Sequence, residues 1–438
     1  MLTSVRAYFS DASNRSRMGY IIEAALEYFI TLLVSGAFLT TLLLQNGIPD
    51  SLTGMISAVG SLAGLVQIFA IFLARIRKVK GVVTLIMLLN QLIFSSLYLI
   101  PFIDIPSNVK TIIFVVFLLG SHLLTNLVAP SKTNWLTSLI DRNKMGIFTA
   151  KKEIVSLIGG MVFSLLMGRM VDHYKAIGEE LTAFILCGIT IFVLCILHTV
   201  TMLIIKKPEE TPNAVEHKKV NIFQDLSALW KNKAFRSLLL MQIIWSGATL
   251  FSTSYFSVYE IQNLGFSLTF ISILAMMGSI SRIIVSPFVG RFADRNSWSK
   301  TLILCVSIAS FAFLINSFCN PATGKVIYPI YQCLYAISMA GINGGMVNII
   351  FDYIPAEQRT SALGFKSAIG GLTGFLTSIV GGWVVGAVQS GGNQILGMTI
   401  YAQQIMSFIT FLAAVFLVVF LKLTIDRLPK LEQQTAKK

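Results

Sequence analysis

The sequence predicts an all-α, polytopic membrane protein with twelve transmembrane helices. Of its 438 residues, 55% are hydrophobic and only 12% are charged, whereas soluble domains carry about 25% charged residues. A bilayer core about 30 Å thick is spanned by about 20 apolar helical residues, and the chain contains twelve apolar runs of roughly this length. These runs are much longer than the roughly 10-residue alternating strands of a membrane barrel, so a closed barrel is excluded.

The twelve runs fall into two groups of six. In order along the chain they cover residues 19–45, 52–74, 81–102, 110–131, 153–172, 181–205, 235–260, 266–289, 301–318, 326–352, 362–388 and 397–422. The longest hydrophilic interruption lies between the sixth and seventh runs, and its second part has the pattern of an amphipathic helix in the cytoplasmic interface. We therefore predict an N-terminal six-helix bundle over 1–205, a cytoplasmic linker over 206–234 and a C-terminal six-helix bundle over 235–438.

Internal similarity indicates that the two bundles are pseudo-symmetric. Residues at the entrance to and along the fifth run match residues in the same place of the eleventh run. The matched positions are Lys152, Gly160, Gly168 and Val171 in the first half, and Lys366, Gly374, Gly382 and Val385 in the second.

The net charge of +14 first raises the question of nucleic-acid binding. Placing the termini on one side leaves only Lys110, Arg169, Lys175 and Lys325 on the far side, out of 34 basic residues. Because basic residues concentrate on the cytoplasmic side, both termini are predicted to be cytoplasmic in a multi-pass protein of the cytoplasmic (plasma) membrane. The basic excess then reflects topology and attraction to the lipid bilayer, and we expect no nucleic-acid partner.

One charged stretch, VGRFADRNSWSK over 289–300, lies between two apolar runs. Gly290 is followed after three residues by Asp294 and then by Arg295, with Lys300 at the end. A glycine permits close helix approach, an aspartate can meet a helix N-terminus, and the basic residues suit the cytoplasmic interface. The alternative is an ordinary positively charged loop with a helix cap.

This pattern resembles the loop signature of the major facilitator superfamily (MFS) of secondary transporters, and the twelve-helix organisation is similar along nearly the whole chain. The resemblance implies the MFS fold and a gating role for Gly290, Asp294, Arg295 and Lys300. It also implies a latch between Asp294 and a basic residue at the start of the eleventh helix, for which Arg359 is the candidate. The first half departs from the signature, since Ala74 replaces the glycine and Lys78 the aspartate.

Two carboxyl groups lie within the first apolar run. Glu23 and Glu27 are four residues apart and therefore share a helix face. Ionisable groups inside a membrane are functional candidates, and neighbouring buried carboxyl groups suit a proton carrier. The alternative is that Glu23 is interfacial and that Glu27 pairs structurally with Lys132 or Arg282.

Aromatic and polar side chains in three further runs are candidates for substrate binding. The resemblance implies that the first, fourth, seventh and tenth helices line a central cavity. Rings combined with amide or hydroxyl groups recognise semi-polar organic molecules such as sugars. The candidates are His122, Asn126, Gln242, Trp245, Tyr331, Gln332 and Tyr335; an intramembrane histidine such as His122 is alternatively a hydrogen-bonded packing residue.

These observations predict a secondary active transporter that moves a small organic solute, such as a sugar or glycoside, by alternating access with proton coupling. A lipid or glycolipid flippase or a multidrug exporter of the same fold is one alternative, and a non-transporting receptor or scaffold is another. The sequence shows no phosphate-binding glycine loop, metal-ligand cluster or nucleophile elbow. We therefore expect no cofactor, no metal and no enzyme activity, and we expect a monomer.

Overall fold

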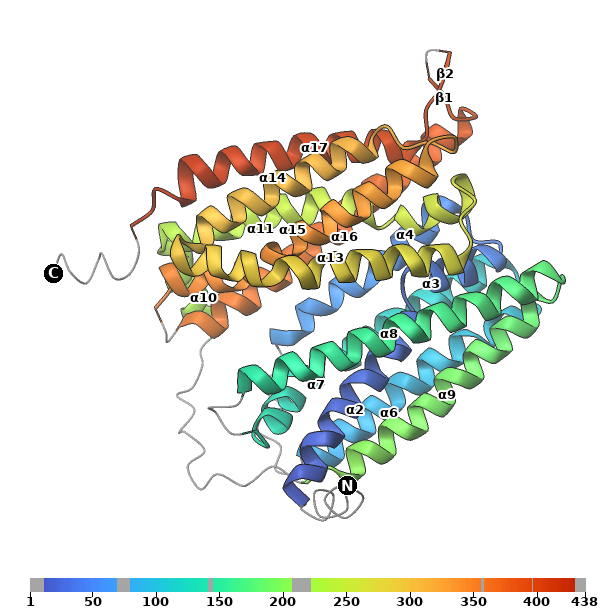
Figure 1. The fold of residues 1–438 in the computed structure, drawn as a ribbon, viewed down its shortest axis with the longest axis horizontal. Coiled ribbons are helices and arrows are strands. Elements are labelled where there is room, and N and C mark those ends of the chain that lie inside the picture. The colour runs from blue at the N-terminus through green and yellow to red at the C-terminus, as the bar shows by residue number, and fades with distance from the viewer. Residues whose placement is uncertain are drawn as a thin grey trace. The chain divides into compact units, whose positions relative to one another are not determined.

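The computed structural model describes residues 12–68, 79–140, 145–206, 222–355, 358–395 and 397–429 (Figure 1). Within these residues eleven helices are long and apolar enough to cross a membrane, and a shorter apolar helix covers Asp50–Val66. The strands found there, β1 (Gln394–Ile395) and β2 (Met398–Thr399), form only a short antiparallel hairpin. The predicted all-α class with twelve membrane helices is confirmed.

The contacts divide the chain into two compact units. The first contains Met1–Ile48, Val66–Val215 and Ser267–Ser272. The second contains Pro49–Leu65, Glu216–Phe266 and Ile273–Lys438. The predicted bundles over 1–205 and 235–438 stay a prediction.

Six helices make up most of the first unit. They are α2 (Ala12–Leu33), α3 (Gly36–Gln45), α6 (Val79–Leu97), α7 (Ser107–Thr137), α8 (Met145–Ala176) and α9 (Glu180–Ile204). Helix α2 packs on α8 and α9, and α6 packs on α7 and α9, so that these helices lie side by side (Figure 1). The break between α2 and α3 falls at extended Ser35 and at Gly36, whose φ of +54° favours glycine.

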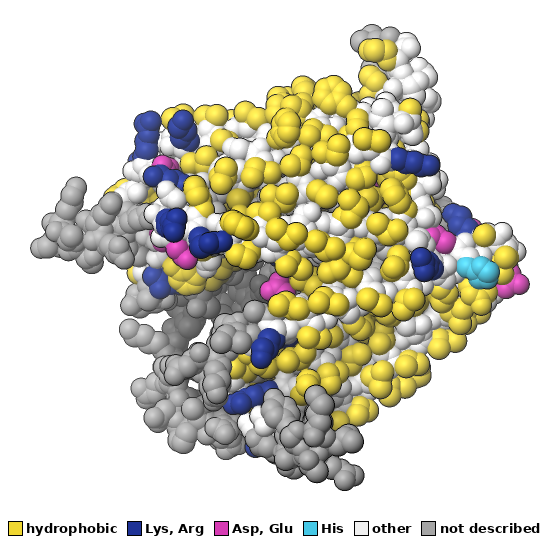
Figure 2. Space-filling view, in the orientation of Figure 1, with side chains coloured by type: hydrophobic (Ala, Val, Ile, Leu, Met, Phe, Trp, Pro, Cys, Tyr) yellow, Lys and Arg dark blue, Asp and Glu magenta, His cyan; other side chains and the backbone are white. Residues whose placement is uncertain are grey.

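One hydrophobic core of the first unit is built from large side chains of α2, α6, α7 and α9. Trp135 and Met202 are buried there, and the Trp135 indole N–H donates to the carbonyl of Lys206 at 2.8 Å. The opposite helix faces carry exposed side chains such as Leu166 and Leu203, which are 61% and 60% exposed. Figure 2 shows hydrophobic side chains along such exposed faces, as expected for helices in contact with lipid.

The second unit contains the remaining helices, except for two short end segments. They are α4 (Asp50–Ala58), α10 (Ile222–Lys231), α11 (Lys233–Thr253), α12 (Phe256–Val258), α13 (Leu268–Arg295), α14 (Trp298–Asn316), α15 (Gly324–Tyr353), α16 (Arg359–Ser390) and α17 (Ala402–Phe420). A 3-10 helix over Val59–Ile68 continues α4, and π-helical turns over Tyr259–Asn263 and Leu421–Ile425 continue α12 and α17. The exceptions are Val66–Ile68 of this 3-10 helix and the start of α13 up to Ser272, which belong to the first unit. Helix α11 packs on α16 and α17, and α14 packs on α15 and α17.

A glycine brings α16 against the backbone of the segment that follows α4. A Cβ atom on Gly371 would lie 2.2 Å from the carbonyl oxygen of Ser61, so any side chain at this position would force the two segments apart. The Ser61 hydroxyl lies 2.8 Å from the carbonyl oxygen of Ala58 and 3.1 Å from that of Gly371, so its hydrogen is shared between its own segment and α16.

Part of the predicted linker forms α10. Leu229 in this helix is fully buried in the core of the second unit, whereas the neighbouring Trp230 is 56% exposed. Residues 207–221 of the linker and the Ala74–Lys78 stretch of the first half lie outside the described residues.

Candidate functional site

The main polar feature of the first unit is a cluster of ionisable side chains from α2, α7 and α9. The ammonium of Lys132 lies 2.7 Å from Oε1 of Glu23 and 2.5 Å from Oε2 of Glu27. Nε2 of His198 lies 3.2 Å from the same Oε1 atom of Glu23. We call these four residues the ion cluster.

Helix geometry explains how the sequence assembles the ion cluster. Glu23 and Glu27 are one turn apart on α2 and point in the same direction. Helix α9 packs on α2 and brings His198 to Glu23. The pairing of Glu27 with Lys132 is the structural alternative that the sequence raised, and Glu23, with a side chain only 1% exposed, is buried within the unit.

The charges of the ion cluster are unequal, because one ammonium faces two carboxylates. With a neutral imidazole the cluster carries a net negative charge, which is unfavourable in a membrane interior. Lys152 of α8 is close, but its Nζ lies 3.5 Å from the Tyr20 hydroxyl and 4.9 Å from the centroid of that ring. Lys152 makes no ion pair with either carboxylate and therefore does not offset this charge.

A cavity of about 260 Å³ opens onto the ion cluster. Its lining residues come from α2, α6, α7 and α8, and they are Tyr20, Glu23, Ala24, Glu27, Met87, Thr125, Ala129, Lys132, Thr133, Leu136 and Lys152. The Glu27 side chain is 30% exposed, against 12% for Lys132. Glu27 is therefore the member of the ion cluster that water or a solute reaches most easily.

A second cavity of about 170 Å³ lies farther along α2 and shares Glu27 and Thr125 with the first. The predicted residue His122 lines this cavity, and its ring meets the Phe94 ring edge-on at 5.8 Å. Asn126, also predicted, is not among the lining residues of either cavity, and its amide donates to the carbonyl of His122 at 2.9 Å.

The candidates predicted in the second unit lie in a tightly packed part of the fold. Trp245 is 7% exposed and belongs to the hydrophobic core. The amide of Gln242 donates to the Ser246 hydroxyl one turn away at 2.7 Å. Gln332 lies beside α13, since a Cβ atom on Gly278 would be 3.6 Å from its Nε2.

Tyr331 and Tyr335 belong to an aromatic cluster on α15. Their rings are stacked with centroids 5.7 Å apart, and Tyr331 also meets Phe256 edge-on at 5.2 Å. Tyr331 is fully buried, and its hydroxyl has no hydrogen-bond partner among the described residues.

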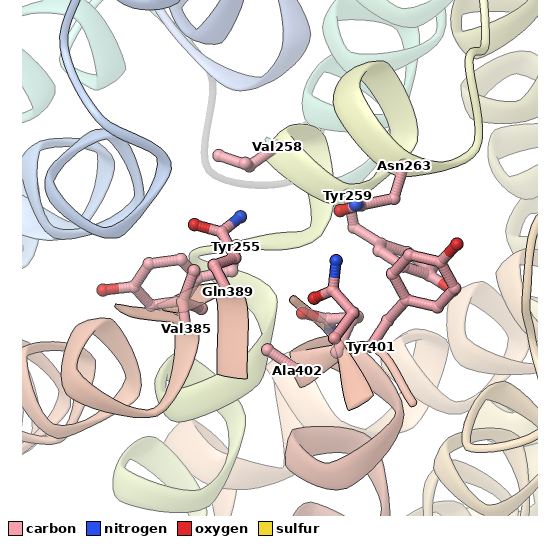
Figure 3. Close-up of a pocket in the computed structure, with 10 residues that line it drawn as sticks. Tyr255, Val258, Tyr259, Asn263, Val385, Gln389, Tyr401 and Ala402 are labelled. Carbon is pink, nitrogen blue, oxygen red and sulfur yellow. The ribbon is translucent and has the colours of Figure 1, made fainter. Parts of the chain in front are cut away.

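A small polar pocket in the second unit is shown in Figure 3. It is lined by residues such as Tyr255, Tyr259, Gln389 and Tyr401, and its volume of about 20 Å³ has room for about one water molecule. The Tyr255 and Tyr259 hydroxyls donate to carbonyl oxygens at 2.7 and 2.8 Å. In this structure the pocket is too small for an organic solute.

The gating role of Gly290, Asp294, Arg295 and Lys300 stays a prediction, and the predicted latch between Asp294 and Arg359 is not formed in this structure. Arg359 donates to the carbonyls of Ile354 and Phe351 at 3.0 and 3.1 Å, at the C-terminus of α15. Asp294 is exposed, and no ion pair joins these two described residues. The last carbonyl groups of a helix lack partners within the helix, and a guanidinium can donate to them. This explains why Arg359 binds the end of α15 and not Asp294.

The loop that carries this motif is held by serines. Ser297 caps α14 by accepting from the backbone N–H of Lys300 at 3.3 Å, and the Ser299 hydroxyl donates to Asp426 at 2.5 Å. Arg295 and Lys300 are exposed. A Cβ atom on Gly290 would meet no described atom within 4 Å, so close helix approach is not the reason for this glycine and that interpretation was wrong.

Two residues near the site were underrated by sequence reasoning. His198 has the apolar surroundings of a packing residue, and only the contact between α9 and α2 reveals its carboxylate partner. Gln91 lines the second cavity and was not among the predicted site residues. A polar amide within an apolar run could have identified it as a candidate.

Comparison with known proteins supports one family. The family model described as Major Facilitator Superfamily matches residues 24–331. Similar solved structures include the nucleoside transporter NupG, with a TM-score of 0.68, 14% identity and coverage of 96% of this chain and 100% of that chain. A D-xylose-proton symporter has a TM-score of 0.69 and 11% identity, covering 92% and 96%.

A third similar structure is a bacterial homologue of the human lysosomal transporter Spinster in an inward-facing and occupied conformation. Its TM-score is 0.64 at 13% identity, with 96% of this chain and 97% of that chain covered. At such identities the likeness shows the fold alone. No curated protein sequence matches the chain.

Proposed function

Because the chain belongs to the major facilitator superfamily, we propose that it is a secondary active transporter that moves a small organic solute across the cytoplasmic membrane by alternating access. Under this proposal both termini are cytoplasmic and the protein acts as a monomer of two six-helix bundles. Transport, and not an enzymatic reaction, is what the family and its structural neighbours indicate.

The observation that supports this proposal most is the ion cluster beside two cavities within membrane-crossing helices. Charged side chains inside a membrane are unfavourable unless they line a water-filled path or serve a function. A cavity lined by carboxylates and an ammonium suits a water-soluble solute better than a lipid tail. The polar lining thus favours a solute transporter over a flippase or multidrug exporter of the same fold.

We further propose that the solute is a sugar or glycoside and that transport is coupled to protons. Two of the similar structures are a nucleoside transporter and a D-xylose-proton symporter, which is compatible with a hydroxyl-bearing solute. Residues of the second unit, Gln242, Trp245, Tyr331, Gln332 and Tyr335, are proposed to bind the solute.

The two carboxylates receive different roles in this proposal. Protonating His198 would bury a second N–H, at Nδ1, which has no acceptor among the described residues, and such a group is unfavourable. Glu27 is the more exposed carboxylate and lines both cavities. Glu27 is therefore proposed to carry the coupled proton, while Glu23 and His198 position Lys132.

A transport assay with matched variants tests the proposal. Purified protein in proteoliposomes is expected to take up a radiolabelled sugar when the outside is acidified, and Glu27→Gln is expected to abolish this pH-driven part. Glu179→Gln, which changes an exposed carboxylate at the start of α9, serves as the control. Intact pH-driven uptake by Glu27→Gln would remove the coupling assignment, and absence of any uptake by the wild type would remove the transport assignment.

A further inference from the structure

The second cavity contains a buried side chain whose hydrogen bonds are missing. Gln91 of α6 is 1% exposed, and neither Oε1 nor Nε2 has a partner among the described residues. A buried amide without partners is unfavourable, because each of its polar atoms has lost its hydrogen bonds to water and gained none within the protein. The neighbouring Asn90 shows the usual situation, since its amide donates to the Ser121 carbonyl at 2.6 Å.

The rest of this cavity is rich in hydrogen-bond acceptors. Thr31, Ser35 and Thr125 line it, and each hydroxyl donates its only hydrogen to a carbonyl one turn earlier, at 2.9, 2.7 and 3.1 Å. These hydroxyls can therefore only accept from a ligand. Glu27 adds a carboxylate, so the lining is rich in acceptors, and its side-chain donors are the amides of Gln91 and Asn90 and one N–H of His122.

This arrangement defines the chemistry of a matching ligand. A ligand with several hydroxyl groups supplies donors to the acceptors, and its oxygens can accept from Gln91 and His122. An anion would be repelled by Glu27, which also accepts from Lys132 at 2.5 Å. An organic cation would leave the N–H groups of Gln91 and His122 unused.

Size and shape restrict the ligand further. The cavity of about 170 Å³ equals about six water volumes of about 30 Å³ each, and it is smaller than the roughly 300–1,000 Å³ of pockets for drug-sized ligands. Ile30, Val34 and Phe94 supply apolar surface in the same lining. Such a mixture suits the C–H face and the hydroxyl edge of one small ring.

We propose that the cavity between α2, α6 and α7 is a binding subsite for a single neutral polyhydroxylated ring, such as a sugar or the ribose of a nucleoside, and that Gln91 is the residue that selects for it. This inference rests on the proposed transport function and adds to it the subsite, the ligand class and a residue on α6. Gln91 exchanges one donor and one acceptor with adjacent hydroxyl groups of the ring. The ligand thus satisfies the amide that the protein leaves unpaired.

The test compares Gln91→Leu with Asn316→Leu in the full-length protein in lipid nanodiscs. The probes are D-glucose, D-xylose, methyl β-D-glucoside, cellobiose and uridine, with choline as an organic cation. Dissociation constants are measured by calorimetry, and the melting temperature is measured without ligand. Uptake of the same probes into proteoliposomes is measured separately.

Gln91→Leu is expected to bind D-glucose, D-xylose, methyl β-D-glucoside and uridine at least about tenfold more weakly than the wild type does. Its melting temperature should be unchanged or higher, because an unpaired amide has been removed. Asn316→Leu removes an amide that donates to Ser407 at 2.9 Å, so it is expected to lower the melting temperature and leave binding unchanged. Gln91→Asn, which keeps the amide, is expected to retain part of the affinity.

Three results would overturn the inference. Equal binding by Gln91→Leu and the wild type would show that Gln91 is not in the subsite, and wild-type uptake of the same probe would leave the transport proposal intact. Binding of choline alone, or of none of the polyhydroxylated probes, would overturn the ligand class. Conversely, weaker binding in Gln91→Leu without any uptake by the wild type would support the subsite and contradict transport.

Discussion

Lys132 and Glu23 form a buried ion pair, with 2.7 Å between Nζ and Oε1 and with side chains 12% and 1% exposed. The pair joins α7 to α2 in the first unit. Attraction between buried charges is offset by the loss of hydration, so such a pair does not by itself make a fold more stable. Breaking it is different, because removal of one partner leaves an uncompensated charge in the interior.

The first prediction concerns this uncompensated charge. Lys132→Met leaves Glu23 and Glu27 without an ammonium and is expected to lower the free energy of unfolding by about 3–5 kcal/mol. Adding Glu23→Gln should recover part of the loss, since one buried negative charge is then removed. Thermal unfolding in nanodiscs measures both effects, and a double variant no more stable than Lys132→Met would contradict the assignment.

The second prediction locates the proton. If Glu27 carries the coupled proton, as proposed, solute binding by the wild type should weaken when this proton is lost at higher pH. Glu27→Gln should bind with little dependence on pH, since its amide cannot release a proton. His198→Gln should retain the dependence of the wild type. Dissociation constants between pH 5.5 and 8.5 provide the measurement, and the opposite behaviour of the two variants would place the proton on the imidazole.

The sequence predicts the helices well because membrane crossing imposes long apolar runs. It also identifies Glu23, Glu27 and Lys132, because charged residues stand out in such runs. It cannot decide which groups pair, since this depends on the rotation of each helix about its axis. Arg359 illustrates the limit, because it bonds to carbonyls at the end of α15 and not to Asp294. The lack of hydrogen-bond partners for the Gln91 amide likewise depends on how the side chains around the cavity pack, which the sequence does not specify.

The third prediction concerns Asp172 of α8. Its two carboxylate oxygens accept from the backbone N–H groups of Leu268 and Thr269 at 3.0 and 2.7 Å, at the first turn of α13. A negative charge is favourable at a helix N-terminus, where N–H groups lack partners. Asp172→Ala is expected to cost about 1–2 kcal/mol in the free energy of unfolding.

Asp172→Asn keeps an acceptor for one of the two N–H groups and should therefore have a smaller effect than Asp172→Ala. Asp104→Ala, at an exposed position between helices, is the matched control and should have little effect. Hydrogen exchange of the Leu268 and Thr269 amides gives a local measurement. Unchanged protection of these amides in Asp172→Ala would contradict the capping role.

The last prediction separates gating from stability at Asp294. This residue is exposed and makes no ion pair with Arg359 in the structure, so Asp294→Asn is expected to leave the melting temperature unchanged. If Asp294 closes the cytoplasmic side in the outward-open state, as proposed from its motif, Asp294→Asn should shift the population towards cytoplasmic opening.

A cysteine introduced at exposed Thr133, which lines the cavity at the ion cluster, reports this shift in a background without the native cysteines. Labelling from the cytoplasmic side should be faster in Asp294→Asn and nearly unchanged in Lys78→Asn, because the first half has a lysine where the motif has its aspartate. Equal labelling rates in the two variants would show that Asp294 has no special role in the gate.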